Sequence, residues 1–240
     1  MSSPREPILR LPPVIAALTA LLVFVHLVRW ALDERTDILV LLWFAFIPAR
    51  YGAAMPVDIV LPGGLAADVW TYVTYAFLHG DLLHLMVNLV WLLAFGTPVA
   101  WRFGTTRFLA LFAVTAAAGA LVHLATHAGE FAPLIGASAA ISGAMAAAVR
   151  FAFDARGPLG MLRGAGPDAY RVPAAPLMQA LRNPTVLVFL VVWFVLNFLF
   201  GASNLPAGLT DDSIAWQAHF GGFLAGLLLF PIFDPVRART

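Results

Sequence analysis

Long apolar runs separated by short polar segments dominate this sequence. A helix needs about 20 apolar residues, at 1.5 Å each, to cross the hydrocarbon core of a bilayer. Runs of about this length, bounded by charge, Gly or Pro, predict six membrane-spanning helices over Pro13–Leu32, Leu82–Trp101, Phe108–Ala125, Leu134–Phe153, Pro184–Phe200 and Ile214–Ile232.

A seventh apolar run, Ile38–Ile47, is too short to span and ends at Pro48 and Arg50. It predicts an interfacial or re-entrant piece within a long first loop, residues 33–81. The pattern as a whole predicts an all-α membrane protein, with residues 1–240 forming one membrane domain.

The composition agrees with a lipid environment. Hydrophobic residues make up 61% of the chain and charged residues 11%, far below the roughly 25% charged residues of a soluble domain. The net charge of +1 argues against a nucleic-acid partner. The absence of cysteine excludes disulfides and thiolate metal sites.

Charge alternates between successive loops. Arginines gather before the first predicted span, after the second, after the fourth and after the sixth, at Arg5, Arg10, Arg102, Arg107, Arg156, Arg163, Arg171, Arg182, Arg237 and Arg239. The opposite loops lean acidic, with Asp33, Glu34, Asp37, Asp58, Asp68, Glu130, Asp211 and Asp212, although Arg35 and Arg50 run against this trend. Because cytoplasmic loops carry excess positive charge, both termini are expected in the cytoplasm.

Few polar residues occur inside the spans, and such residues are functional candidates by default. His84 and Asn88 stand four residues apart in the second span, and Ser138 lies near the start of the fourth. Asp81, just before the second span, is expected to cap its helix. His219 lies near the start of the sixth, followed three and seven residues later by Gly222 and Gly226 on the same face. These three spans enter from the same side, so the polar residues are expected to meet in one layer near that surface.

This layer has the composition of a hydrolytic site. A serine hydroxyl becomes a nucleophile when a base removes its proton, and histidine is the common base, so Ser138 and His219 form a candidate pair. Donors for an oxyanion would be the Ser138 N–H, the His84 imidazole and the Asn88 amide. We found no deep Asp to orient the base, which predicts a dyad.

Each signal also has a structural interpretation. Small residues around Ser138 and Ser142 are typical of helix packing, and His84 with Asn88 would also serve as hydrogen-bonding glue between helices. His123 and His127 have a spacing that suits a metal, but with Glu130 as the sole nearby carboxylate we expect none there. His79 is expected to support the site from outside, and His26 to be a packing residue. Agreement in depth and sidedness across three helices favours the catalytic interpretation.

At this point the residues resemble the rhomboid intramembrane serine proteases, over most of the chain. The matching pieces are Trp70, FLHGDLLHLMVN before and within the second span, GASA opening the fourth and AHFGGFLAG opening the sixth. The resemblance implies a six-helix bundle with a large first loop, Ser138 as nucleophile, His219 as base, and His84 with Asn88 at the oxyanion. It also implies close helix packing at Gly136, Gly222 and Gly226.

Two positions depart from the family pattern. Ala139 follows the candidate nucleophile where the family usually has Gly, and its methyl group is expected to crowd the approach of the fourth and sixth spans. Thr71 follows Trp70 where many members have Arg, so the contribution of that Arg to the first loop is missing.

The sequence therefore favours a membrane endopeptidase, without a cofactor, that cleaves transmembrane helices of other proteins in a plasma (inner) membrane, in keeping with a bacterial source. The alternative is a rhomboid-like pseudoprotease that binds membrane-protein clients, which Ala139 favours and the intact Ser138 and His219 oppose. A transporter would show mid-membrane charges or paired broken helices, and the sequence has neither.

Overall fold

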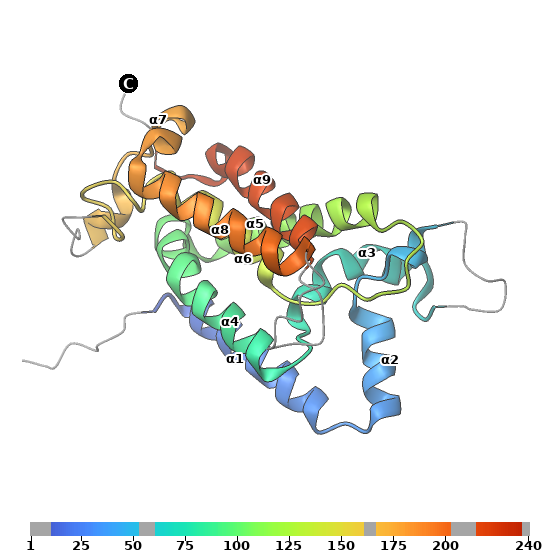
Figure 1. Cartoon of the computed structure of the whole chain (residues 1–240). Coiled ribbons are helices and arrows are strands. Elements are labelled where there is room, and N and C mark those ends of the chain that lie inside the picture. Colours follow the sequence, from blue (N-terminus) through green and yellow to red (C-terminus); the bar gives the residue numbers. More distant parts are fainter. Residues whose placement is uncertain (1–10, 53–60, 161–166, 203–214, 237–240) are drawn as a thin grey trace, which may run out of the picture.

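The computed structural model describes residues 11–52, 61–160, 167–202 and 215–236, and the regular elements in these ranges are helical. The α-helices are α1 (Pro13–Trp30), α2 (Glu34–Phe44), α3 (Gly64–Thr74), α4 (Leu82–Trp91), α5 (Thr97–Thr126), α6 (Ser138–Ala148), α7 (Leu177–Arg182), α8 (Pro184–Ala202) and α9 (Trp216–Phe233), as labelled in Figure 1. Three short 3₁₀ turns, η1 (Pro48–Tyr51), η2 (Tyr75–Phe77) and η4 (Pro167–Arg171), and a π-helical turn, η3 (Leu92–Gly96), complete the set. The prediction of an all-α protein is confirmed.

Some residues used in the sequence argument lie outside the described ranges. They are Ile214, where the sixth predicted span begins, and the loop charges Arg5, Arg10, Asp58, Arg163, Asp211, Asp212, Arg237 and Arg239.

Several of the helices suit a multi-pass membrane protein. Pro13–Trp30, Leu82–Thr126 and Trp216–Phe233 are long and apolar enough to cross a bilayer, and Ser138–Ala148 and Pro184–Leu199 are shorter apolar helices. The second stretch breaks at Gly104, whose φ of 75° and ψ of 170° are not helical. That break falls within the polar segment that separates the second and third predicted spans. The chain is thus a helical membrane protein.

Helix α6 is shorter than predicted, because it covers Ser138–Ala148 and not the whole of Leu134–Phe153. Its 11 residues reach about 16 Å, roughly half of the hydrocarbon core. Before it the chain is extended, and the backbones of Leu134 and Phe46 exchange two hydrogen bonds in an antiparallel bridge. This bridge replaces the helical turn that the apolar sequence predicted.

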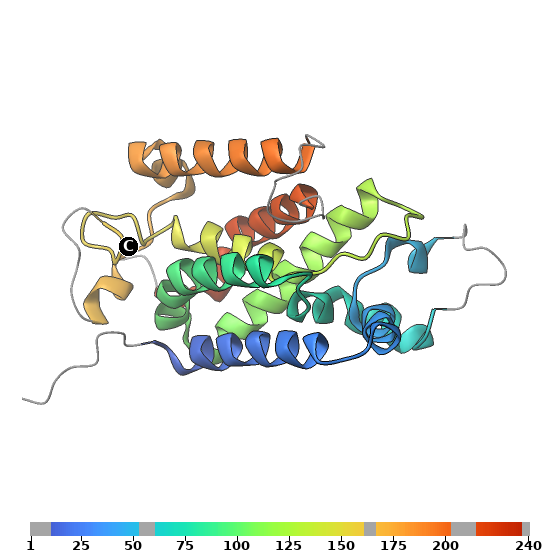
Figure 2. The same cartoon turned by 60° about the horizontal axis from the view of Figure 1, so that its bottom comes forward.

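Three of the helices, α4, α6 and α9, begin at the same end of the bundle. Figure 2 shows α1 on one side of the bundle and α8 on the other, with α4, α5, α6 and α9 between them. The first turns of α4, α6 and α9 lie at the end near α2 and α3, whereas α1 begins and α9 finishes at the opposite end. The first turns of these three helices therefore lie at one level of the bundle.

The first loop is built from helices that hold one another through aromatic contacts. Asp33 caps α2 by accepting from the Thr36 N–H, so most of the predicted interfacial run is helical. The Trp70 ring stacks on Trp43 at 6.1 Å, and its indole N–H donates to the Trp43 carbonyl at 2.9 Å. Among the described residues of the loop, these two tryptophans hold α2 and α3 together.

An arginine, Arg50, also holds this loop together, although position 71, where many family members have Arg, is Thr here. Thr71 is buried and its hydroxyl contacts the Tyr51 hydroxyl at 2.7 Å. The Arg50 guanidinium donates to the carbonyls of Leu42 and Pro62 and lies 3.7 Å from the Asp68 carboxylate. Arg50 therefore ties parts of the first loop together, because its guanidinium presents several donors to separate acceptors.

A buried ion pair fastens the end of the bundle away from the first loop. Arg102 donates two hydrogen bonds to the Asp234 carboxylate, at 2.8 and 2.9 Å, and two more to the carbonyls of Tyr170 and Val172. The side chains of Arg102 and Asp234 are 0% and 7% exposed. One guanidinium thus joins α5, η4 with the residue that follows it, and the C-terminus of α9.

We predict that Arg102→Ala will lower the free energy of unfolding by about 3–5 kcal/mol, because it strands a buried carboxylate. The measurement is thermal unfolding of the purified protein in detergent. Arg107→Ala, which removes an exposed arginine five residues along the chain, is the matched control. Equal melting temperatures for the two variants would contradict this role of the Arg102–Asp234 ion pair.

Candidate active site

Ser138 and His219 are hydrogen-bonded across two helices. Ser138 is the first residue of α6 and His219 the fourth of α9, and His219 Nε2 lies 2.6 Å from Ser138 Oγ. This distance is within the range from which a base can take a hydroxyl proton. The two residues that the sequence paired are thus in contact although 81 positions separate them.

Glycines of α9 allow this approach. A Cβ atom at Gly222 would strike the Ala139 carbonyl oxygen, and one at Gly226 would strike the Gly143 carbonyl oxygen. The backbones of α6 and α9 therefore touch along two successive turns. This contact sets the distance over which Ser138 and His219 meet.

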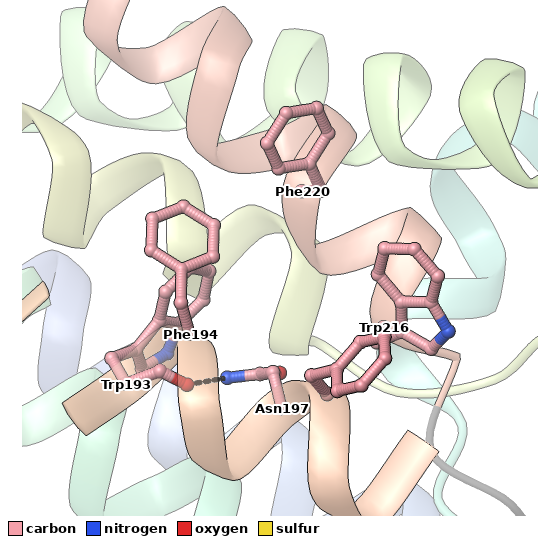
Figure 3. Close-up of a pocket in the computed structure, with 6 residues that line it drawn as sticks. Trp193, Phe194, Asn197, Trp216 and Phe220 are labelled. Carbon is pink, nitrogen blue, oxygen red and sulfur yellow. Dashed lines mark hydrogen bonds between the residues drawn. The ribbon is translucent and has the colours of Figure 1, made fainter. Parts of the chain in front are cut away.

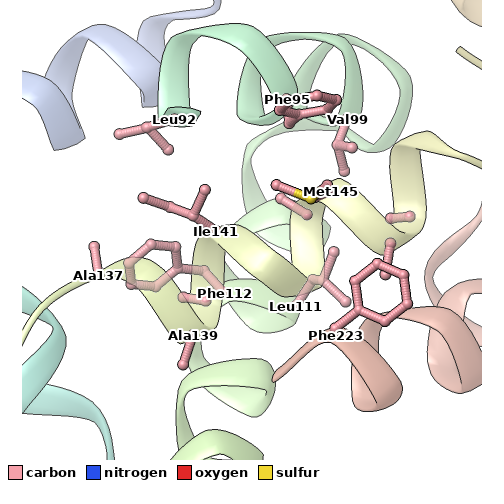
Figure 4. Packing of buried hydrophobic residues seen from close by; sticks show 14 of the residues in the cluster. Leu92, Phe95, Val99, Leu111, Phe112, Ala137, Ala139, Ile141, Met145 and Phe223 are labelled. Carbon is pink, nitrogen blue, oxygen red and sulfur yellow. The ribbon is translucent and has the colours of Figure 1, made fainter. Parts of the chain in front are cut away.

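The Ala139 methyl group does not point at α9. A Cβ built at Gly119 of α5 would lie 2.5 Å from the Ala139 Cβ, so the Ala139 side chain occupies the space that Gly119 leaves open. Figure 4 shows this methyl group directed at α5. The crowding expected between the fourth and sixth spans is absent, because Gly119 on the third accommodates the extra methyl.

His84 lies beside the nucleophile. Asp81 caps α4 by accepting from the His84 N–H at 2.7 Å, as the sequence predicted. A Cβ at Gly136 would lie 2.6 Å from His84 Nε2 and 3.7 Å from Ser138 Oγ. Gly136 has a φ of +111°, which favours glycine, and it makes room for the His84 ring next to Ser138 instead of packing two helices.

Asn88 and Ser142 bond to their own helices. The Asn88 amide nitrogen donates to the His84 carbonyl at 2.9 Å, and the side chain is buried with its Oδ1 atom unpaired. The Ser142 hydroxyl donates to the Ser138 carbonyl at 2.7 Å. Asn88 therefore lies one turn from His84, without a direct bond to Ser138.

The first loop supports the segment that carries the nucleophile. The Tyr75 carbonyl accepts from the Gly136 N–H at 3.1 Å, and the buried Tyr75 hydroxyl donates to the Ala116 carbonyl at 2.8 Å. Together with the Phe46–Leu134 bridge, these bonds fix residues 134–136 immediately before Ser138. The long first loop thus helps to position the start of α6.

A further side chain, Asn197 of α8, contacts His219 and was not predicted from the sequence. Its Oδ1 atom lies 2.5 Å from His219 Nδ1, and its Nδ2 atom donates to the Trp193 carbonyl at 2.8 Å (Figure 3). Asn197 was detectable as the one strongly polar side chain inside the apolar stretch from Pro184 to Phe200. Its contact with His219 could not be predicted, because no sequence rule gives the position of α8 along α9.

His123 and His127 lie apart from this cluster. Their rings stack at 4.1 Å, and His127 Nδ1 contacts the Thr126 hydroxyl at 2.8 Å. Among the described residues, no group of three or more His, Asp or Glu side chains is arranged to hold a metal ion.

The chain matches the Rhomboid domain family over residues 66–234, more than half of its length. The chain belongs to the rhomboid family. All of the side chains around Ser138 described above, apart from Phe46, lie within the matched segment.

Individual members of the family can be compared with this chain one by one. RHOMBOID-like protein 5 of Arabidopsis thaliana is 29% identical over 67% of this chain and 42% of its own length. Rhomboid-like protease 3 of Toxoplasma gondii is 28% identical over 68% of this chain and 51% of its own length. Rhomboid protease GlpG of Yersinia pestis is 41% identical over 49 residues, 20% of this chain and 18% of its own. This rhomboid chain therefore spans about half of the first two relatives or less.

The contact between Gly119 and Ala139 gives a test of packing at the site. Gly119→Ala is expected to lower the melting temperature, because its methyl would meet the Ala139 methyl and lie 2.8 Å from the Ala218 carbonyl. Adding Ala139→Gly should recover part of the loss, and Ala139→Gly alone should have little effect. Simple additivity of the two changes in thermal unfolding would contradict the contact.

The stability of the folded protein should depend on pH through His79. His79 lies before α4 and packs edge-on against His84, with 5.1 Å between the ring centroids. Burial, with repulsion from His84, His26 and Arg29, lowers the pKa of His79 to about 3. Between pH 6.5 and 3 the unfolded chain binds the proton that the folded chain excludes, so stability should fall as pH falls through this window. His79→Phe should flatten the decline of melting temperature with acidity; an unchanged slope would refute this.

Proposed function

We propose that this rhomboid chain is an intramembrane serine endopeptidase that cleaves transmembrane helices of other membrane proteins. The observation that carries the proposal is the 2.6 Å contact between Ser138 Oγ and His219 Nε2. The family includes proteins named as proteases, which supports the same reaction class.

In the proposed mechanism Ser138 Oγ attacks a peptide carbonyl carbon while His219 Nε2 accepts the hydroxyl proton. The resulting tetrahedral intermediate collapses when His219 returns this proton to the departing amine, leaving an acyl group on Ser138. A water molecule, deprotonated by His219, then releases the acyl group by the same steps.

The negative charge on the carbonyl oxygen requires donors on the side opposite His219. Ser138 begins α6, so its backbone N–H belongs to a helix N-terminus and lacks an intrahelical acceptor. The proximity of Gly136 to both His84 Nε2 and Ser138 Oγ supports the imidazole as a second donor. The Asn88 amide, one turn along α4, is the third donor that we propose, after rotation from the His84 carbonyl.

The proposed substrates are helices with weak helical propensity near one end. A helical peptide hides each carbonyl in a backbone hydrogen bond, so cleavage requires local unwinding, which Gly or Pro makes easier. We further propose six spans in a plasma membrane, with both termini cytoplasmic. The arginine bias supports this orientation and puts the end of the bundle that carries Ser138 on the outer side.

The test is cleavage of a model transmembrane substrate in liposomes by the purified chain and by Ser138→Ala, His219→Ala and Ser142→Ala. Ser138→Ala and His219→Ala should abolish cleavage, whereas Ser142→Ala, which changes a serine bonded to its own helix, should retain most of it.

Cleavage that survives Ser138→Ala would sink the mechanism. A folded chain that cuts none of a panel of helices, yet binds them, would support the client-binding pseudoprotease.

A further inference from the structure

The ring of His219 is held at both nitrogens. Nε2 faces Ser138 Oγ at 2.6 Å, and Nδ1 faces Oδ1 of Asn197 at 2.5 Å. Three helices, α6, α9 and α8, therefore contribute one side chain each to a continuous hydrogen-bonded chain. In a dyad His219 would be the last member of this hydrogen-bonded series, whereas here Asn197 follows it.

The orientation of the Asn197 amide follows from its second bond. The Trp193 carbonyl, one turn earlier on α8, lies 2.8 Å from Asn197 Nδ2 and can only accept a hydrogen bond. Reversing the amide would bring two oxygen atoms together at this distance. The amide oxygen must consequently face His219, where it can only accept.

This orientation selects one form of the imidazole. An accepting oxygen at Nδ1 requires that Nδ1 carry the proton, which leaves Nε2 unprotonated in the neutral ring. An unprotonated Nε2 is what a base needs in order to take the Ser138 proton. We propose that Asn197 is a positioning residue that holds His219 in this tautomer, an inference that rests on the proposed function.

The surrounding contacts fix Asn197 in register with His219. Trp193 stacks on Phe223 of α9 at 5.1 Å on one side of Asn197, and Phe198 meets Trp216 edge-on at 6.1 Å on the other. Figure 3 shows Trp193 and Trp216 on either side of Asn197. These aromatic pairs bracket the amide and hold α8 against α9 at this level.

An amide suits this helix better than a carboxylate would. Most side chains of α8 are exposed and apolar, among them Val191, Val192, Val195 and Leu196, as expected of a helix that faces lipid. A charged group there would be costly, whereas a neutral amide supplies the same acceptor without a charge. The arrangement has the Ser-His-Asn order of roles, in which the third group orients the base.

The first experiment reads the tautomer directly in the unaltered protein. Ring ¹⁵N chemical shifts of histidine, with the His219 signals identified by their loss in His219→Ala, distinguish a protonated Nδ1 from a protonated Nε2. We expect Nδ1 to carry the proton in the neutral ring. A His219 ring protonated at Nε2 would overturn the proposal without any change to Asn197.

The second experiment measures reactivity with a fluorophosphonate probe, which needs no peptide substrate. Ser138 Oγ forms a bond to phosphorus, fluoride departs and His219 takes the hydroxyl proton. Asn197→Leu keeps the branched shape of the side chain without the acceptor, and a pocket of about 240 Å³ lined by residue 197 leaves space for the larger methyl groups. We expect labelling to slow roughly tenfold, the order of magnitude of one lost hydrogen bond, with a mixed tautomer signal.

Val195→Leu, on the same helix and 48% exposed, is the matched control and should label at the wild-type rate. Wild-type labelling and an unchanged tautomer in Asn197→Leu would overturn the role of Asn197 while leaving the protease proposal intact. Failure of the unaltered chain to react, with His219 still protonated at Nδ1, would instead count against the proposed function alone.

Discussion

The contact between the backbones of α6 and α9 is the constraint on which the site depends. Gly222 and Gly226 leave no side chain between the helices, so their main chains meet at Ala139 and Gly143. The side chains of Ser138 and His219 meet at the end of this backbone contact, at 2.6 Å. In a bilayer, where apolar burial drives helix association little, such close packing also supplies much of the attraction.

The start of α6 is the second element that the architecture controls. A helix of only 11 residues cannot span the hydrocarbon core, and the extended segment before it needs partners for its backbone groups. The first loop provides them through Phe46 and the Tyr75 carbonyl. The long loop that a simple bundle would not need is therefore part of the framework around Ser138.

The hydrogen-bonded groups at the centre of the site are a hydroxyl, an imidazole and an amide. Ser138, His219 and Asn197 form a chain without a carboxylate, and His84 approaches from the other side past Gly136. The formal ion pair of Arg102 and Asp234 lies at the opposite end of the bundle, where it joins α5 to α9. This ion pair therefore fastens the helices at a distance from Ser138 and His219.

The sequence by itself determined the helical membrane class, the apolar segments, the Asp81 cap and the pairing of Ser138 with His219, because these follow from run length, local spacing and the rarity of polar residues in lipid. It overestimated α6, because an apolar segment reads the same whether helical or extended, and it misplaced the expected crowding by Ala139. Only the tertiary structure decided that Gly119 receives this methyl group and that Asn197 reaches His219. Both depend on how neighbouring helices are rotated and shifted, which interhelical packing sets and local sequence does not encode.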